Sequence, residues 1–223
     1  MNFAIIVAGG TGSRMGSEIP KQFIKIGKLP ILMHTINRFF ELDKSLTIIL
    51  ILPESQFDFW NELCMEYDFN IPHQIVAGGY SRFQSVGNGL KTITTNDGLV
   101  AIHDGVRPFV NKEIIQKSFE IAAEKGNAIV AVKLKDSIRI EEPNGTTKAL
   151  DRSKFHLIQT PQTFQLKLIK QAFNTPELTE FTDDATVLER LGEKINLIEG
   201  SYQNIKITTP EDLIFAEAIF SNQ

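Results

Sequence analysis

Five short apolar runs, each about the length of one β-strand, constrain the fold of this chain more than any other feature. They are FAIIVA at 3–8, LTIILIL at 46–52, HQIVAG at 73–78, LVAIHD at 99–104 and AIVAVK at 128–133. Nearly continuous apolar character predicts strands of a parallel sheet that is covered on both faces. The segments between them have helical periodicity, at 30–42, 55–68, 82–94 and 111–125. This alternation predicts an α/β fold with a doubly wound, mostly parallel sheet.

The pattern changes after Lys135. The segment 136–152 alternates polar and apolar residues around Pro143-Asn144-Gly145, which predicts a β-hairpin. Because this hairpin is thin and polar, it is either a protruding arm that packs on a partner subunit or a simple solvent-exposed hairpin. We expect further strands at HLIQ and INLIEG, and further helices at 165–173, at 182–191 and after the N-cap Thr209.

Length and charge exclude several classes of protein. The 223 residues suffice for one domain, and we expect a single domain over 1–223 with 136–152 as its arm. A net charge of −4 argues against a nucleic-acid or anionic membrane partner. The single cysteine, Cys64, has no intrachain disulfide partner, and the N-terminus lacks the pattern of a signal peptide. We therefore expect a cytoplasmic protein.

A glycine-rich stretch, AGGTGSRMGSEIPKQF at 8–23, follows the first apolar run. Its glycines allow backbone N–H groups to close on an anion without interference from a Cβ atom. Arg14 adds a planar fork for phosphate oxygens, and Lys21 adds a compact charge. Both suit a triphosphate whose pyrophosphate gains charge as it leaves, so the stretch predicts nucleotidyl transfer.

Other interpretations of this loop fit less well. A P-loop requires Gly-Lys followed by Ser or Thr, which is absent here. The dinucleotide pattern G-x-G-x-x-G has Met15 in place of its third glycine, and no acidic residue ends a second strand about 20 residues on. A loop that needs glycine only for its turns is the remaining alternative.

A second glycine-rich stretch, GGYSRFQSVGNGL at 78–90, also follows an apolar run. Ser81 is the expected N-cap, and Ser85 is placed to hydrogen-bond the edge of a base. Gly87 and Gly89 weaken a helix, so either another group approaches its backbone closely or the helix is a frayed surface one. Arg82 would bind a phosphate or form an ordinary surface ion pair.

Polar residues at other predicted strand ends complete the candidate site. Asp104 is suited to hold Mg²⁺ beside phosphates, and Arg107 to bind a second anion; a β-turn aspartate with a structural arginine is the alternative. We expect His103 to be a core residue. Thr182 reads as a helix N-cap or as a substrate contact, and Lys206, ending the NIKI run, as a phosphate contact or as a surface lysine.

Six motifs in this order resemble the 2-C-methyl-D-erythritol 4-phosphate cytidylyltransferase family over about residues 3–220. They are AGGTGSRMGSEIPKQF, AGGYSRFQSVGNGL, IHDGVRPFV, DRSKFHLIQTPQTF, FTDDATVLERLG and NIKITTPEDL. The resemblance implies a Rossmann-like nucleotidyltransferase fold that transfers CMP from CTP to a polyol phosphate, with Mg²⁺ as cofactor and a homodimer as the assembly.

The resemblance also implies roles for individual residues. Arg14 and Lys21 match the residues that stabilise the transition state, and Asp104 matches the magnesium ligand. The nucleotide contacts match Ala8, Gly9, Gly10, Gly12, Ser85 and Lys206. The acceptor contacts match Arg107 and Thr182 in the same subunit, and Ser137 and Arg152 from the partner's arm.

Three other functions remain as alternatives. The nearest is a ribitol 5-phosphate cytidylyltransferase, which shares the glycine loop and the PKQF and QTPQ motifs. A guanylyl- or uridylyltransferase would use the same sheet. A catalytically silent nucleotide-binding module would be expected to lack Arg14, Lys21 or Asp104, which are all present.

Overall fold

The computed structural model describes residues 1–10 and 19–222. The described residues form a seven-stranded sheet in the order β11-β7-β10-β6-β1-β4-β5. Its strands are β1 (Asn2–Val7), β4 (Thr47–Leu52), β5 (Gln74–Ala77), β6 (Leu99–Asp104), β7 (Asn127–Lys133), β10 (His156–Gln165) and β11 (Leu197–Glu199). β10 runs antiparallel to β6 and β7, and the other neighbouring pairs are parallel. The predicted mostly parallel sheet is confirmed.

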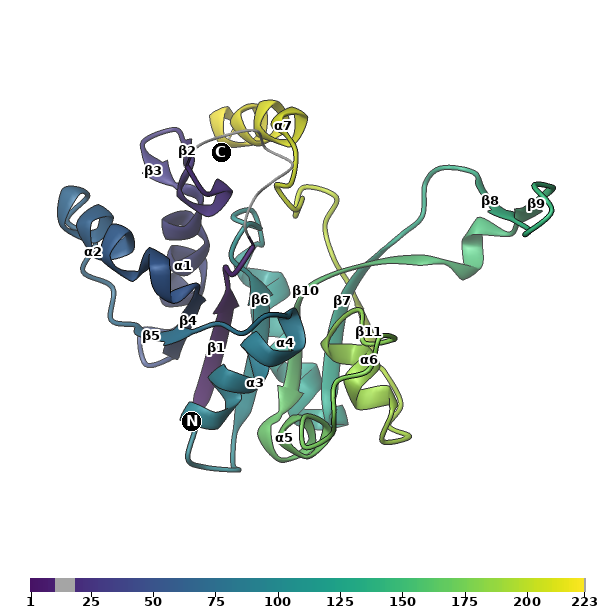
Figure 1. Ribbon diagram of the computed structural model, residues 1–223, viewed down its shortest axis with the longest axis horizontal. Coiled ribbons are helices and arrows are strands. Elements are labelled where there is room, and N and C mark those ends of the chain that lie inside the picture. Colours follow the sequence, from purple (N-terminus) through teal and green to yellow (C-terminus); the bar gives the residue numbers. More distant parts are fainter. Residues whose placement is uncertain (11–18, 223) are drawn as a thin grey trace.

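Helices cover both faces of the sheet (Figure 1). One hydrophobic cluster joins β1 residues Ala4 and Ile6 to side chains of α1 (Ile31–Leu42), α2 (Phe57–Glu66) and α4 (Lys112–Lys125). The alternate β1 residues, Phe3 and Ile5, face a second cluster with α3 (Arg82–Thr92), α5 (Leu166–Ala172) and α6 (Asp184–Glu189). Apolar side chains on both faces of one strand therefore explain the doubly wound arrangement.

The carboxyl ends of the parallel strands meet at one edge of the sheet, on the side of α7 (Pro210–Ser221) (Figure 1). Thr209 caps α7 by accepting from the backbone N–H of Asp212, and Pro210 occupies the first turn, as predicted. Short elements complete this edge: β2 (Lys25–Ile26), β3 (Leu29–Pro30) and the 3₁₀ turns η2 (Lys21–Phe23) and η3 (Glu54–Gln56). The sequence did not predict the small β2–β3 hairpin.

The predicted hairpin is present and projects away from the sheet in Figure 1. Its strands, β8 (Ile138–Glu141) and β9 (Thr147–Leu150), pair antiparallel, and the turn η4 (Arg152–Lys154) leads back to β10. Gly145 has a φ of +80°, which favours glycine, and its N–H donates to the Glu142 carbonyl at 2.8 Å. The Pro-Asn-Gly turn therefore forms the β8–β9 hairpin that the sequence predicted.

Among the residues that the structure describes, no helix combines the length and the apolarity that a bilayer crossing requires.

Candidate active site

The ends of β1 and β6 bring the first glycine-rich stretch next to Asp104. Val7 pairs with Asp104 in the strand register, and Ala8, Gly9 and Gly10 follow directly. The Gly105 N–H donates to the Val7 carbonyl at 2.8 Å, which joins the two segments beyond the strand ends. A Cβ atom at Gly105 would lie 2.9 Å from the Ala8 Cβ, so this close approach requires glycine.

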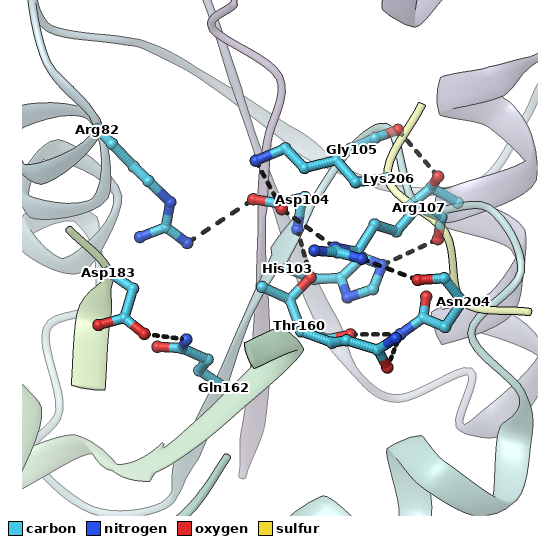
Figure 2. A network of polar contacts seen from close by, with 12 residues as sticks. Arg82, His103, Asp104, Gly105, Arg107, Thr160, Gln162, Asp183, Asn204 and Lys206 are labelled. Carbon is cyan, nitrogen blue, oxygen red and sulfur yellow. Dashed lines mark hydrogen bonds and ion pairs between the residues drawn. The ribbon is translucent and has the colours of Figure 1, made fainter. Parts of the chain in front are cut away.

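Asp104 is a buried carboxylate approached by three cationic side chains (Figure 2). Its Oδ2 atom lies 3.1 Å from Lys206 Nζ and 3.2 Å from Arg107 Nε. Its Oδ1 atom lies 3.8 Å from Arg82 Nη2. Burial alone would raise the pKa of Asp104, but the charges of Lys206, Arg82 and Arg107 outweigh it and hold the pKa well below its usual value. Asp104 is therefore ionised at neutral pH.

Hydrogen bonds from two further elements fix this cluster. The Thr160 hydroxyl accepts from the Asp104 N–H at 3.0 Å, next to a register shift in β10. The Asn204 carbonyl accepts from Arg107 Nη1 at 2.8 Å, and the Asn204 amide donates to the Thr160 carbonyl at 2.9 Å. Arg107 and Thr160 are consequently held through one asparagine, which orients the buried guanidinium.

His103 precedes Asp104 and is fully buried, as expected for a core residue. Its Nε2 lies 3.1 Å from the Arg107 carbonyl, and its ring stands edge-on to Phe39. Burial lowers the pKa of His103 to about 4, so the ring is neutral near pH 7. In its neutral form the His103 ring donates its Nε2–H to the Arg107 carbonyl and so stabilises the backbone at Arg107.

One hollow lies over the glycine-rich stretches. Ser85 lines this hollow and is buried, and its hydroxyl accepts from the Gly79 N–H at 3.0 Å. A Cβ atom at Gly10 would lie 3.6 Å from Lys21 Cε, so the lysine stem passes directly over this glycine. The hollow is lined by Val7, Ala8, Gly9, Gly10, Lys21, Gln22, Gly79, Tyr80, Ser81, Arg82, Ser85, Asp104, Val106 and Lys206.

A second hollow lies on the side of β10 and α6. It is lined by Arg82, Asp104, Arg107, Ile158, Gln159, Thr160, Gln162, Thr182, Asp183 and Lys206. The two hollows share Arg82, Asp104 and Lys206, which form the boundary between them. Two ligands, one in each hollow, would meet at this charged boundary.

The structure brings most of the expected site residues together. Ala8, Gly9, Gly10, Lys21 and Ser85 line the first hollow, and Arg107 and Thr182 line the second. Ser137 and Arg152 are exposed at the base of the arm and line neither hollow. Arg14 and Gly12 lie outside the described residues.

Two sequence interpretations need correction. Asp183 rather than Thr182 caps α6, because its carboxylate accepts from the Thr186 N–H at 2.9 Å. Lys206 does not end a strand, since Asn204–Ile207 lies in irregular backbone. By contrast, the close approach expected at Gly89 is confirmed: a Cβ atom there would lie 3.0 Å from Ile51 Cδ1 of the sheet.

Sequence reasoning missed Gln22 and Asn204 as supporting residues. Gln22 is buried, and its amide donates to the Ala8 carbonyl at 3.0 Å, which anchors the start of the first glycine-rich stretch. The sequence did hold a signal for Gln22, since a polar residue stands between the basic and the aromatic residue of the PKQF motif. Asn204 carried no such signal, because its partners come from distant parts of the chain.

The donor set of the site fits a magnesium ion held mainly by phosphates. Within the described residues no cluster of three or more His, Cys, Asp or Glu side chains could enclose a metal. Asp104 offers one ionised carboxylate. Among the residues that the structure describes, its Oδ1 atom is approached only by Arg82 Nη2, at 3.8 Å. Magnesium is commonly held by one or two carboxylates together with substrate phosphates, and such a site requires no cage of protein ligands.

Comparisons with known proteins agree with this geometry. The profile of a family described as 2-C-methyl-D-erythritol 4-phosphate cytidylyltransferase matches residues 2–222. The protein of that name from Bacteroides thetaiotaomicron is 46% identical over 215 residues, covering 96% of this chain and 97% of its own. The protein of that name from Bacteroides fragilis is 46% identical over 216 residues, and the alignment covers 97% of this chain and 98% of the relative.

A solved structure gives the same result. The crystal structure of 4-diphosphocytidyl-2C-methyl-D-erythritol synthase from Anaerococcus prevotii superposes with a TM-score of 0.85 at 33% identity. The superposition covers 99% of this chain and 96% of the Anaerococcus prevotii chain. Similarity therefore extends over sheet, site and arm together.

Proposed function

This chain belongs to the 2-C-methyl-D-erythritol 4-phosphate cytidylyltransferase family, and from that premise we propose how its own residues carry out the reaction. The enzyme transfers CMP from CTP to 2-C-methyl-D-erythritol 4-phosphate and releases pyrophosphate. The similarity of its relatives favours this acceptor over ribitol 5-phosphate. The observation that carries our account is the charged boundary of Arg82, Asp104 and Lys206 between two hollows.

CTP occupies the first hollow, with its base near Ser85 and its phosphates over Ala8, Gly9 and Gly10. Backbone N–H groups next to glycine can approach phosphate oxygens without steric hindrance. Lys206 also lines this hollow, and its ammonium already pairs with Asp104. Lys21, with Arg14 from the same stretch, stabilises the charge that develops on the α-phosphate and on the leaving pyrophosphate.

The acceptor occupies the second hollow, with its phosphate directed at the boundary. Arg107 and Thr182 bind it from within the same subunit, and Arg107 is held in place by Asp104 and Asn204. An oxygen of the acceptor phosphate then attacks the α-phosphorus of CTP in line and displaces pyrophosphate. This step needs no covalent intermediate, because both phosphates meet at the same cations.

Asp104 would hold the magnesium ion of this reaction. When bound beside the phosphates, such an ion neutralises part of their charge. The low pKa of Asp104, caused by its three cationic neighbours despite its burial, keeps the carboxylate ionised and ready to act as ligand.

The arm supports a homodimeric assembly. Ser137 and Arg152 are exposed at its base, so in a dimer they would extend the acceptor hollow of the partner subunit. Apolar side chains next to the arm are also exposed, which is typical of an interface: Phe155, Leu157, Ile158, Leu197 and Tyr202. The unpaired Cys64 supports a reducing compartment, the cytoplasm, for this assembly.

Product analysis tests the proposed function. The purified protein is incubated with 2-C-methyl-D-erythritol 4-phosphate and, in parallel, with CTP, GTP or UTP. We expect a cytidine diphosphate ester of the acceptor and pyrophosphate from CTP, and little product from the other nucleotides. Equal use of GTP or UTP, or release of phosphate in place of pyrophosphate, would contradict it.

A further inference from the structure

The sequence left two roles open for Arg82: binding a phosphate or forming a surface ion pair. It is the first residue of α3. Among the described residues, only Arg82, Asp104 and Lys206 line both hollows. Figure 2 shows Arg82 and Arg107 reaching toward Asp104 from opposite sides. Arg82 therefore stands where the two reacting phosphates would meet.

The Arg82 guanidinium is held from one side only. Its Nη1 atom donates to Asp184 Oδ1 at 2.5 Å, which is the only hydrogen bond of this guanidinium within the described residues. Its Nη2 atom faces Asp104 Oδ1 at 3.8 Å, beyond hydrogen-bond distance. A guanidinium carries five N–H donors, so the edge facing the boundary keeps donors for an incoming anion.

Asp184 is an unusual partner for a surface arginine. Its side chain is 1% exposed, whereas that of Arg82 is 28% exposed, and its Oδ2 atom is buried without a hydrogen bond in the described part of the chain. A buried carboxylate with one bonded oxygen is costly, and replacing such a pair by apolar residues often stabilises a fold. A role in orienting Arg82 accounts for this pair better than a role in stability does.

We infer that Arg82 contacts the phosphates at the boundary as a further cation of the transfer reaction, and that Asp184 is the residue that positions it. This inference rests on the proposed function, since it places Arg82 against the substrates of that reaction. Asp184 touches no substrate. It acts by fixing one edge of the guanidinium so that the other edge is presented to oxygen atoms whose charge changes during transfer.

A double-mutant cycle tests both roles. The variants are Arg82→Met, Asp184→Asn and the two combined, with Arg190→Met as control because its pair with Glu180 is exposed and lies in neither hollow. We expect Arg82→Met to lower kcat by about 10²-fold, with the KM for CTP changed much less. Asp184→Asn should lower kcat by about tenfold, as expected for a misplaced contact.

The combined variant separates positioning from structure. If Asp184 acts through Arg82, the double variant has the kcat of Arg82→Met alone, because the group to be positioned is already gone. It also removes the unpaired buried charge, so it serves as the folded reference in thermal unfolding if either single variant is unstable. Wild-type kcat in Arg82→Met, or multiplied losses in the double variant, would overturn the inference.

Different results would contradict the proposed function and the role of Arg82. A wild-type protein without cytidylyl transfer would contradict the proposed function. An active wild-type protein whose Arg82→Met variant turns over normally would contradict only the role of Arg82.

Discussion

The ammonium of Lys206 lies 3.1 Å from the carboxylate of Asp104, although one residue ends β6 and the other lies in irregular backbone just before α7. This contact joins the sheet edge to the carboxyl-terminal segment at the boundary of two hollows. It leaves the lysine 43% exposed, so the cation remains accessible to a ligand while its position is fixed.

Asp104→Asn should lower turnover by about 10²–10³-fold, because it removes both the proposed magnesium ligand and the anchor of three cations. It should also destabilise the fold by on the order of 3 kcal/mol, since the buried Arg107 loses its carboxylate partner. Steady-state kinetics and chemical denaturation measure the two effects. In the wild type, chelation should abolish activity and added Mg²⁺ should restore it; full activity in a chelator would contradict the role of Asp104.

Lys21→Ala should lower turnover by about 10²–10³-fold with the fold retained, and Arg14→Ala should do the same. The reason is the loss of a cation that we propose faces the charge that grows in the transition state. Lys28→Ala is the matched control, because Lys28 is an exposed lysine close by in the chain. A folded Lys21→Ala protein with near-normal turnover would rule out this assignment.

The stability of the protein should fall as the pH is lowered from 6.5 to 4. Burial lowers the pKa of His103 to about 4, so in this range the unfolded chain takes up a proton that the folded chain does not. The effect amounts to about 3 kcal/mol for this group. Below this range Asp104 adds to the loss, because its folded pKa is depressed and its stabilising contribution disappears as it protonates.

His103→Gln should make stability less dependent on pH between 6.5 and 4, because glutamine has no proton to gain. Burial also lowers the pKa values of His34 and His73, so a residual slope should remain. His156→Gln is the control, since His156 is exposed. Denaturant unfolding at several pH values measures the slope, and an unchanged slope in His103→Gln would contradict the neutral buried histidine.

Mixing two inactive variants should restore activity if the arm completes a partner's site. Arg152→Ala lacks the donated contact, and Lys21→Ala lacks a contact of its own subunit. In a mixed dimer one of the two sites has both residues, so about a quarter of the wild-type activity should return after random exchange. Lys148→Ala, an exposed lysine on β9, is the control. Failure of the mixture, together with a monomeric mass in solution, would contradict the dimer.

The sequence predicted those parts of the structure that depend on local patterns. The apolar runs ending at Val7 and Asp104 lie at adjacent strand ends, so the motifs that follow them come together as expected. The Pro-Asn-Gly turn and the Thr209 cap were likewise determined by neighbouring residues.

Features that depend on packing between distant segments were not predictable. The bond between Arg82 and Asp184 joins α3 to α6, and no local pattern relates the two. Gly89 was interpreted as a sign of close approach, but only the packed structure shows that Ile51 of the sheet is the neighbour. The cap of α6 was assigned one residue too early because Thr182 and Asp183 are both good N-cap residues.

The choice of acceptor tests the central claim most directly. Initial rates of pyrophosphate release from CTP are measured with 2-C-methyl-D-erythritol 4-phosphate, with ribitol 5-phosphate and with no acceptor. We predict rapid release with the first acceptor, matched one to one by cytidylylated product, and little with the second or without acceptor. Equal or faster release with ribitol 5-phosphate, or release that needs no acceptor, would contradict the account.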